Sequence, residues 1–208
     1  MNENIIKFYL IAHRLKEKIR TGWIEVEISN SRLESVAEHI YGCLMLAIAI
    51  ESEYKLDIDM YKVLKMLALH ELEETIMKDF TIRDKISLED KRELGRKCVK
   101  EATEGLIKQD EIKNLLEEFN EHETKESIFC YHIDKIECDF QAKIYDLQGD
   151  FKLEKAIEDL EYFGKGAEGI KEKVKTASDV WIEYDKRRYE DDEIFKNLIN
   201  DIQNIDTI

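Results

Sequence analysis

The chain has 208 residues, a formal net charge of −15 at pH 7, no proline and only 8 glycines. Its acidity opposes binding to nucleic acid polymers, because each phosphate contact needs a Lys or Arg and the long-range field repels polyanions. The sequence contains no apolar run long enough to span a membrane and no signal-peptide pattern at its N-terminus. We therefore expect a cytoplasmic protein with neither a nucleic acid polymer nor a membrane as partner.

The composition favours an all-α fold. Few helix-breaking residues are present, and the recurring Leu, Ile, Glu and Lys are good helix formers. A chain of this length can bury roughly 70% of its unfolded surface in one domain, and no linker, repeat or low-complexity tract divides it. We predict a single helical-bundle domain over 1–208, in which additional C-terminal helices over 151–208 pack on the rest or support a homodimer.

The first predicted helix covers residues 4–20. Apolar residues recur in it at helical spacing, and these are Ile5, Phe8, Ile11, Ala12, Leu15 and Ile19. Gly22 follows at the position of a helix C-cap. Trp23 is then expected in the loop after this helix.

The second predicted helix begins at a capping box. Ser31 is followed three residues later by Glu34, which is the spacing at which a serine and a glutamate cap a helix N-terminus reciprocally. The helix is expected to run to about residue 53. It contains His39.

The third predicted helix runs from about residue 59 to residue 73 and is largely apolar up to His70. A histidine with an adjacent acid at the end of a buried helix costs free energy if it is left unpaired. An acidic turn carrying Glu74 and Asp79 follows.

The rest of the chain also shows helical patterns. Residues 88–119 predict one or two strongly charged helices, and residues 123–147 predict a long helix that contains Asp134. The apolar stripe of that long helix is expected to consist of Ile128, Tyr131, Ile136, Phe140 and Ile144.

Two histidines and several acids carry the chemistry of this sequence. His39 and His70 each stand beside a carboxylate, and Asp134 supplies another far downstream. Two imidazole nitrogens with two carboxylate oxygens suit a divalent transition metal. In a helix, His70 and Glu74 are four residues apart and share a face.

Four ordered strings of this chain resemble a known family. They are LKEKIRTGW (15–23), RLESVAEH (32–39), LALHELEETIMKD (67–79) and IDKIECDFQA (133–142). The chain resembles the HD-domain metal-dependent phosphohydrolases, and among them the 5'-deoxynucleotidases of the YfbR and HD-domain-containing-protein-2 type. The resemblance covers about residues 8–150.

The resemblance implies a metal site and an active site. One divalent ion (Mn, Co, Fe, Ni, Zn or Mg) would be held by four ligands, namely His39, His70, Glu71 and Asp134. By the same resemblance, Glu74 is the catalytic carboxylate and Asp79 a further active-site acid. Arg20 and Trp23 would bind the phosphate and the sugar of a nucleotide.

Two departures from the family pattern stand out. The family has Asp where this chain has Glu71, which is one methylene longer. The family also continues with Gly-Asp and a proline-containing turn, where this chain has residues 78–83, KDFTIR. The geometry of that turn therefore does not follow from the resemblance.

Simpler interpretations exist for several of these residues. Trp23 can be a core residue, and an acidic run such as the one around Glu74 is commonly a solvated helix end. His13, His122 and His132 lack matching strings, so we assign them to packing or the surface. Four widely spaced cysteines, at 43, 98, 130 and 138, are expected to be reduced core thiols.

The sequence thus predicts a metal-dependent hydrolase that acts on small nucleotide substrates, (deoxy)ribonucleoside 5'-monophosphates. One alternative is a degenerate HD module that binds metal and nucleotide without turnover. A third hypothesis is a helical interaction protein whose metal is structural. Turnover separates the first hypothesis from the other two.

Overall fold

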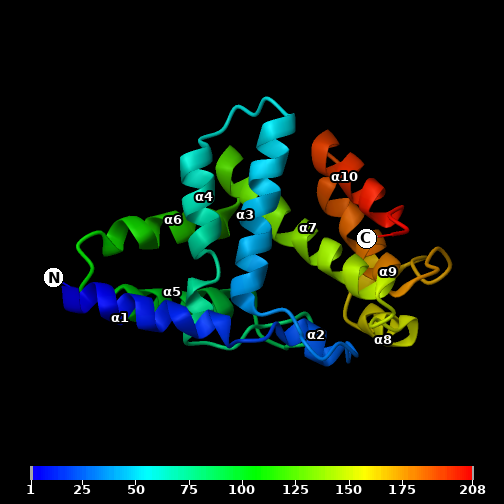
Figure 1. The fold of residues 1–208 in the computed structure, drawn as a ribbon, viewed down its shortest axis with the longest axis horizontal. Helices are drawn as coiled ribbons and strands as arrows, with labels where there is room; N and C mark the ends of the chain where they lie inside the picture. The colour runs from blue at the N-terminus through cyan, green and yellow to red at the C-terminus, as the bar shows by residue number, and fades with distance from the viewer. Residues whose placement is uncertain (1, 208) are drawn as a thin grey trace. The chain divides into compact units, whose positions relative to one another are not determined.

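The computed structural model describes residues 2–207, and their regular structure consists of helices with a single isolated β-bridge between Ile19 and Ser35. The all-α prediction is confirmed. Contacts between residues divide the chain into two compact units, which are described one after the other (Figure 1). The first comprises residues 1–20, 34–80 and 84–133, and the second comprises residues 21–33, 81–83 and 134–208.

The first unit is built around two antiparallel neighbours, α3 and α4 (Figure 1). Its elements are α1 (Asn2–Ala12), η1 (His13–Lys16), α3 (Val36–Glu53), α4 (Met60–Leu69), η2 (Leu72–Thr75), α5 (Leu88–Thr103), α6 (Gln109–Glu121) and the start of α7 (Lys125–Leu147). One buried cluster joins α1, η2, α5 and α6, through Ile11, Leu72, Val99, Ala102 and Leu116. This core fixes the short helix η2 against α5.

The first helix is shorter than predicted. It ends at Ala12, and η1 continues the chain in a tighter turn. Beyond η1 the backbone is extended, because Arg20 N donates to the carbonyl of Glu34 and Val36 N donates to the carbonyl of Lys18. The expected C-cap at Gly22 is wrong, since Gly22 lies inside the short helix α2 (Thr21–Glu25).

The second helix begins four residues later than predicted. Its capping box is formed by Ser35 and Glu38 rather than by Ser31 and Glu34. The Ser35 hydroxyl accepts from Glu38 N at 3.3 Å, and the Glu38 carboxylate accepts from Ser35 N at 2.8 Å. The end of the helix at Glu53 is as predicted.

The third helix starts where expected and stops early. Asp59 is its N-cap, and its side chain accepts from Lys62 N. The α-helix ends at Leu69, with His70 as C-cap, and residues 72–75 form the 3₁₀ helix η2. The assumption of one continuous α-helical face through His70 and Glu74 is therefore wrong.

Downstream, α5, α6 and α7 confirm the predicted helices; of the predicted stripe of α7, Ile136 is buried as expected, Tyr131, Phe140 and Ile144 are half-buried, and Ile128 is not buried. Ile128 is 39% exposed, and the neighbouring Phe129 and Cys130 are buried instead. Ile133, also buried, is the last residue of α7 in the first unit.

The second unit has an aromatic core. Its elements are α2, the remainder of α7, α8 (Leu153–Glu158), η3 (Asp159–Glu161), η4 (Gly164–Ala167), α9 (Ala177–Asp185), η5 (Lys186–Tyr189) and α10 (Glu193–Gln203). Trp23 stacks on Trp181 with ring centroids 5.0 Å apart and meets Tyr145 edge to face at 5.2 Å. The predicted helical character of 151–208 is confirmed, and a single domain over 1–208 stays a prediction.

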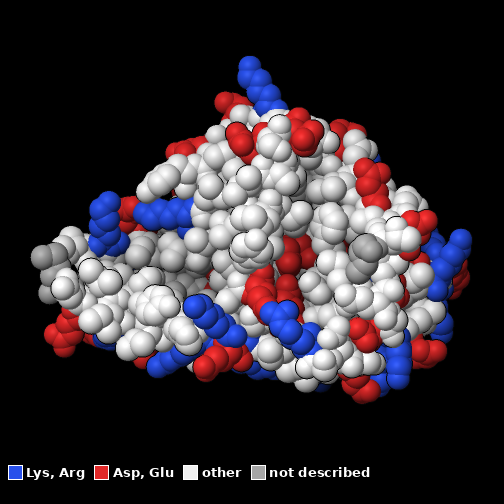
Figure 2. All heavy atoms as spheres, viewed as in Figure 1, with Lys and Arg blue, Asp and Glu red and all other residues white. Residues whose placement is uncertain are grey.

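The surface carries charges of both signs. On the face shown in Figure 2, Asp and Glu side chains alternate with Lys and Arg, and uncharged residues lie between them. Among residues 2–207, no helix is both long and apolar enough to cross a lipid bilayer.

Candidate metal centre and active site

Two histidines of the first unit meet in its interior. His39 lies on α3 and is 0% exposed, and His70 at the C-terminus of α4 is 6% exposed. Their Nε2 atoms are 3.3 Å apart. Two ligands about 2.1 Å from one metal at a tetrahedral angle lie about 3.4 Å apart, so this separation suits a shared ion.

The orientation of His70 is set by its backbone. Its Nδ1 lies 2.7 Å from the carbonyl oxygen of Leu67. A carbonyl can only accept, so Nδ1 carries the proton and Nε2 keeps its lone pair. This is the arrangement typical of metal-binding histidines, in which the second nitrogen donates to a carbonyl or carboxylate.

Glu71 brings a carboxylate to the same point. Its Oε1 lies 3.7 Å from Nε2 of His39 and 3.7 Å from Nε2 of His70. The same oxygen accepts from Nη1 of Arg20 at 2.9 Å. The longer side chain that departs from the family pattern thus reaches both the histidines and the cation.

Glu74 lies beside this triangle with an incomplete set of hydrogen bonds. It is 3% exposed, and no hydrogen-bond partner within residues 2–207 reaches its Oε2. Burial first, then the charges of Glu71 and Asp79, raise the pKa of Glu74 to about 10. A cation beside Glu74 would oppose that shift by stabilising the carboxylate.

The 3₁₀ geometry explains which acids face the histidines. In a 3₁₀ helix, side chains three residues apart lie above one another. Glu71, the N-cap of η2, and Glu74 are so related, whereas Glu73 points about a third of a turn away. The 3₁₀ helix therefore places Glu74 on the side of the histidines, which an α-helix had been expected to do.

Two basic residues hold this turn by its backbone. Nζ of Lys18 donates to the carbonyls of Glu74 and Met77, and Nη1 of Arg14 donates to the carbonyl of Thr75 at 3.4 Å. Arg14 lies in η1, and Lys18 lies two residues after the end of η1. These roles could not be predicted from the sequence, because every residue has a backbone carbonyl and the accepting positions therefore show no characteristic residue type.

Asp79 joins Glu71 and Glu74 in an acidic cluster of the first unit, and Arg20 is the cation beside it. Nη1 of Arg20 lies 4.0 Å from Oδ1 of Asp79, in addition to its bond with Glu71. Asp79 is 6% exposed and shares a hydrogen bond with Glu74. The structure therefore brings five of the predicted site residues together with His39, namely Arg20, His70, Glu71, Glu74 and Asp79.

The other two predicted site residues belong to the second unit. Asp134 follows Ile133 directly in α7, is 6% exposed, and has its Oδ2 2.8 Å from Nζ of Lys135. Its role as fourth ligand stays a prediction. Trp23 is 2% exposed in the aromatic core, as its alternative assignment to packing requires, and its contact with a substrate also stays a prediction.

One further donor was overlooked in the sequence. Cys43 is 0% exposed, and its Sγ lies 3.6 Å from Nε2 of His39. The sulfur, the two histidines and their nitrogens form a compact group of potential ligands. The spacing of four residues on one helix was a signal for this contact.

The remaining histidines and cysteines serve packing. His132 is 8% exposed, and the exposed His122 contacts Tyr131 with ring centroids 4.2 Å apart. Cys98 and Cys130 are buried, like Cys43, whereas Cys138 is half-buried. The expectation of free core thiols therefore holds for three of the four cysteines.

The donor set fits a divalent cation. Neutral imidazole with carboxylate is the ligand chemistry of first-row transition metals. The Oε2 atom of Glu74 has no hydrogen-bond partner in the part of the chain that the structure describes, and an ion or its bound water can supply one. The residues present therefore suit an ion held by His39, His70 and Glu71.

Comparisons with known proteins agree with these features. A family model described as an HD domain matches residues 12–177. The 5'-deoxynucleotidase HDDC2 of Dictyostelium discoideum is 32% identical over 154 residues, which cover 70% of this chain and 79% of the relative. The 5'-deoxynucleotidase hdd1 of Schizosaccharomyces pombe is 29% identical over 168 residues, which cover 78% of this chain and 81% of the relative.

A solved structure supports the fold. A conserved hypothetical protein from Pyrococcus furiosus superposes with a TM-score of 0.63 and 24% identity, over 96% of this chain and 99% of the other. At that identity the likeness concerns the fold alone. It agrees with the helical architecture described above.

Proposed function

This chain belongs to the HD-domain family of metal-dependent phosphohydrolases, and we propose that it removes the phosphate from nucleoside 5'-monophosphates, with deoxyribonucleotides preferred. The observation that carries this proposal is the triangle of His39, His70 and Glu71, with the buried Glu74 carboxylate beside it. The two relatives named 5'-deoxynucleotidase support the choice of substrate. The proposed partner is therefore a small nucleotide.

The proposed metal ligands are His39, His70, Glu71 and Asp134. A bound divalent ion supplies Lewis-acid polarisation of a phosphate oxygen and a lowered pKa for bound water. Mn, Co, Fe, Ni, Zn and Mg all accept such ligands to different degrees, and imidazole nitrogen favours the transition metals among them.

Arg20 is proposed to bind the phosphate. Its guanidinium lies at the acidic cluster, 15% exposed at the side chain, and offers several N–H donors in a plane. The carboxylates of Glu71 and Asp79 fix its orientation before substrate arrives. A preoriented donor costs little reorganisation when charge builds up on phosphorus-bound oxygens.

Glu74 is proposed as the group that exchanges a proton in the reaction. Its Oε2 has no protein hydrogen bond to break, and burial with the charges of Glu71 and Asp79 raises the pKa of this carboxyl. A proton held at this oxygen is available to the leaving 5' oxygen. Asp79 shares the hydrogen bond that orients the carboxyl.

A phosphate-release screen tests the proposal. Protein stripped with a chelator and reloaded with Mn, Co, Ni, Zn or Mg is assayed on deoxy- and ribonucleoside 5'-monophosphates, with the matching 3'-monophosphates as controls. We expect release from the 5' esters in the presence of at least one transition metal. Binding of metal and nucleotide without release would assign the chain to a non-hydrolytic binding module.

The metal site is tested separately. A His39→Ala, His70→Ala double variant should lose bound metal, measured by elemental analysis of protein purified without added ions. The control is Glu51→Gln, an exposed change on the same helix as His39, which should keep wild-type occupancy. Equal occupancy in the double variant and the control would contradict the proposed site.

A further inference from the structure

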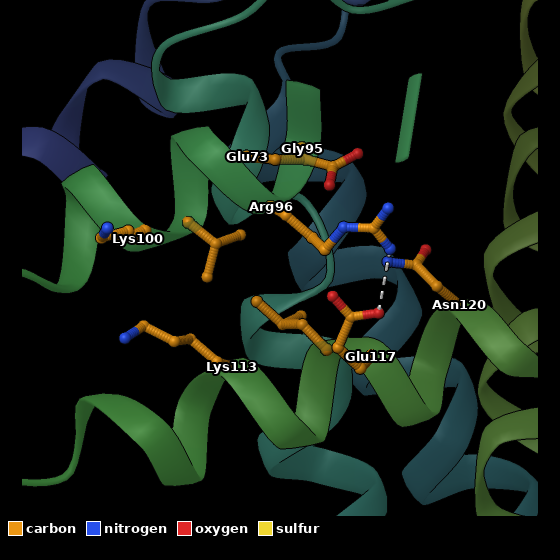
Figure 3. A pocket seen from close by; sticks show the side chains of 9 residues that line it. Glu73, Gly95, Arg96, Lys100, Lys113, Glu117 and Asn120 are labelled. Atoms are coloured by element: carbon orange, nitrogen blue, oxygen red, sulfur yellow. Dashed lines mark ion pairs between the residues drawn. The ribbon is translucent and has the colours of Figure 1, made fainter. Parts of the chain in front are cut away.

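A cavity lies in the first unit, and its lining includes none of the histidines. It has a volume of about 170 Å³ and lies against α5 and α6, with one wall supplied by η2 (Figure 3). Its lining residues are Glu73, Gly95, Arg96, Val99, Lys100, Lys113, Leu116, Glu117 and Asn120. Val99 and Leu116 make it partly apolar, and charged side chains surround that apolar part.

The carboxylate of Glu73 faces this cavity without a protein partner. Within residues 2–207 it makes neither a hydrogen bond nor an ion pair, although the charge of Lys91 acts on it from farther away. It approaches α5 closely, because a Cβ built on Gly95 would lie 2.2 Å from its Oε2. The absence of a side chain at Gly95 therefore leaves the space that this carboxylate occupies.

The cations of the cavity differ in how far they are neutralised. Arg96 pairs with Glu89 at 3.4 Å and with Glu117 at 3.7 Å. Lys100 makes no ion pair or hydrogen bond to any described residue, and Lys113 pairs with the solvent-exposed Asp110 at 3.0 Å. In Figure 3 the ammonium groups of Lys100 and Lys113 point to the same side of the cavity, away from the Arg96–Glu117 pair.

These charges define the ligand. Glu73 repels a simple anion, and the two lysines repel a simple cation. A small molecule with an ammonium at one end and an anionic group at the other satisfies both, and a short carbon chain between them suits Val99 and Leu116. A cavity with an apolar wall and a few convergent charged groups is the usual form of a small-ligand site.

We propose that this cavity binds a small zwitterion, whose ammonium pairs with Glu73 and whose anionic group pairs with Lys100 and Lys113. The site is regulatory, because Glu73 belongs to the same short helix as Glu74. Glu71 and Glu74 face the histidines while Glu73 faces the cavity, so a ligand on Glu73 acts on the active-site turn from another side. Occupation of the cavity then restrains residues 72–77.

Binding is tested with 2-aminoethylphosphonate, whose carbon–phosphorus bond resists hydrolysis by a phosphomonoesterase, and with its one-carbon and three-carbon homologues. The controls are ethylphosphonate, which lacks the ammonium, and ethylamine, which lacks the anion. By calorimetry on the full chain, we expect saturable binding of at least one zwitterion and weaker binding of both controls. No binding of any zwitterion at millimolar concentrations would overturn the proposal.

Matched variants locate the binding. Glu73→Gln and Lys100→Ala should each weaken it by about tenfold or more, the usual value of a charge-assisted hydrogen bond. The controls Glu101→Gln and Lys97→Ala change the same residue types at exposed positions of α5 outside the cavity. Equal affinity in the two sets would overturn the assignment to this cavity.

Gly95→Ala is a second test that keeps the helix intact. Alanine favours a helix over glycine, while its Cβ must displace the Glu73 carboxylate or fill its space. We expect a folded protein with the zwitterion affinity lowered at least as far as in Glu73→Gln. Wild-type affinity in folded Gly95→Ala would contradict the predicted contact.

The proposed effect of the zwitterion on residues 72–77 is measured without an activity assay. Amide hydrogen exchange of residues 72–77 should slow when the zwitterion binds, and should not change in Glu73→Gln. Unchanged exchange in saturated wild-type protein would overturn the coupling. Because neither this readout nor calorimetry uses a nucleotide, failure of the proposed nucleotidase activity would leave the result interpretable.

Discussion

Two equally buried carboxylates, one in each unit, have opposite hydrogen-bonding situations. Asp159 in the second unit and Glu74 in the first are both 3% exposed. Asp159 accepts from Nε of Arg83 at 2.9 Å and from Nε1 of Trp181 at 2.8 Å. Among the described residues, Oε2 of Glu74 has no such donor.

The difference separates an acid that is paired within the fold from one for which we propose a catalytic role. Burial raises the pKa of Asp159, but the Arg83 cation and the Trp181 N–H oppose the shift and hold the carboxylate in place. Glu74 has two carboxylate neighbours, with Arg20 as the cation that counters them. A buried polar atom left without a partner calls for an explanation, and a bound ion or substrate supplies one.

The largest expected effect comes from Glu74→Gln. The change keeps shape and hydrogen-bonding capacity while removing the exchangeable proton, so kcat on the best nucleotide should fall by about 10² to 10⁴ fold. Metal content and circular dichroism should match wild type. Loss of the metal would instead make Glu74 a ligand, and near-normal turnover would shift the proton role to Asp79.

Asp159→Ala should act on stability alone. The loss should be about 1–3 kcal/mol, because the N–H of the half-buried Trp181 loses its acceptor while Arg83 keeps the longer ion pair with Glu25 at 3.9 Å. Urea denaturation should show this loss, while kcat per folded molecule stays near wild type. Asp201→Ala, an exposed change on α10, is the control and should shift stability little. A comparable loss in both variants would show that the buried Asp159 contributes no more to stability than an exposed acid.

The pH dependence of stability should also distinguish the two acids. In metal-free protein the pKa of Glu74 is raised from 4.5 to about 10, so the folded state holds a proton that the unfolded state has released. Stability should therefore fall as pH rises above about 4.5, and Glu74 alone should contribute a slope of at most about 1.4 kcal/mol per pH unit. The measurement is urea unfolding between about pH 5 and pH 8 in the presence of a chelator.

Two variants assign this slope. Glu74→Gln should lower the slope by up to about 1.4 kcal/mol per pH unit across the whole range, so that the profile becomes flat only above about pH 7. Glu73→Gln should lower it only below about pH 7, because burial, followed by the charge of Glu71, raises the pKa of Glu73 to about 7. If Glu74→Gln and wild type have parallel profiles, the carboxyl of Glu74 is ionised in the metal-free fold.

Much of the fold followed from local patterns in the sequence. The absence of proline and the scarcity of glycine predicted helices, and α4 begins at Met60, close to its predicted start at about residue 59. The capping box was misplaced because Ser31/Glu34 and Ser35/Glu38 have the same spacing. In the structure Ser35 also forms an isolated β-bridge with Ile19, a contact distant in sequence that the spacing of serine and glutamate does not show.

The site was predictable in its residue types and not in its geometry. His39, His70 and Glu71 meet as the family strings implied, yet the turn that aims Glu71 and Glu74 is a 3₁₀ helix held by Lys18 through backbone carbonyls. Spacing rules for an α-helix could not show this. Tertiary contacts with α5 and the η1 segment override the local preference.

Lys18 provides a smaller test of the first unit. Lys18→Met removes the donor to the carbonyls of Glu74 and Met77, so Glu74 should be less well placed and kcat should fall about tenfold, or about 1.4 kcal/mol. KM and metal content should change little, and Lys18→Arg should restore part of kcat. Lys16→Met, an exposed change nearby, is the control. A change in KM alone would point to substrate binding instead.

Glu71→Asp is expected to have the smallest effect. It restores the carboxylate length of the family pattern, and the shorter side chain should favour the histidines over Arg20, whose Nη1 now lies 2.9 Å from Oε1 of Glu71. We expect metal affinity to rise or to fall by no more than about tenfold, or about 1.4 kcal/mol, measured by competition with a chelating dye. Complete loss of metal would show that the backbone at residue 71, the N-cap of η2, is adapted to the longer acid. In that case the Arg20 contact and the ligand role of Glu71 would depend on one another, and Asp159 would remain the buried acid whose pairing is independent of any ion.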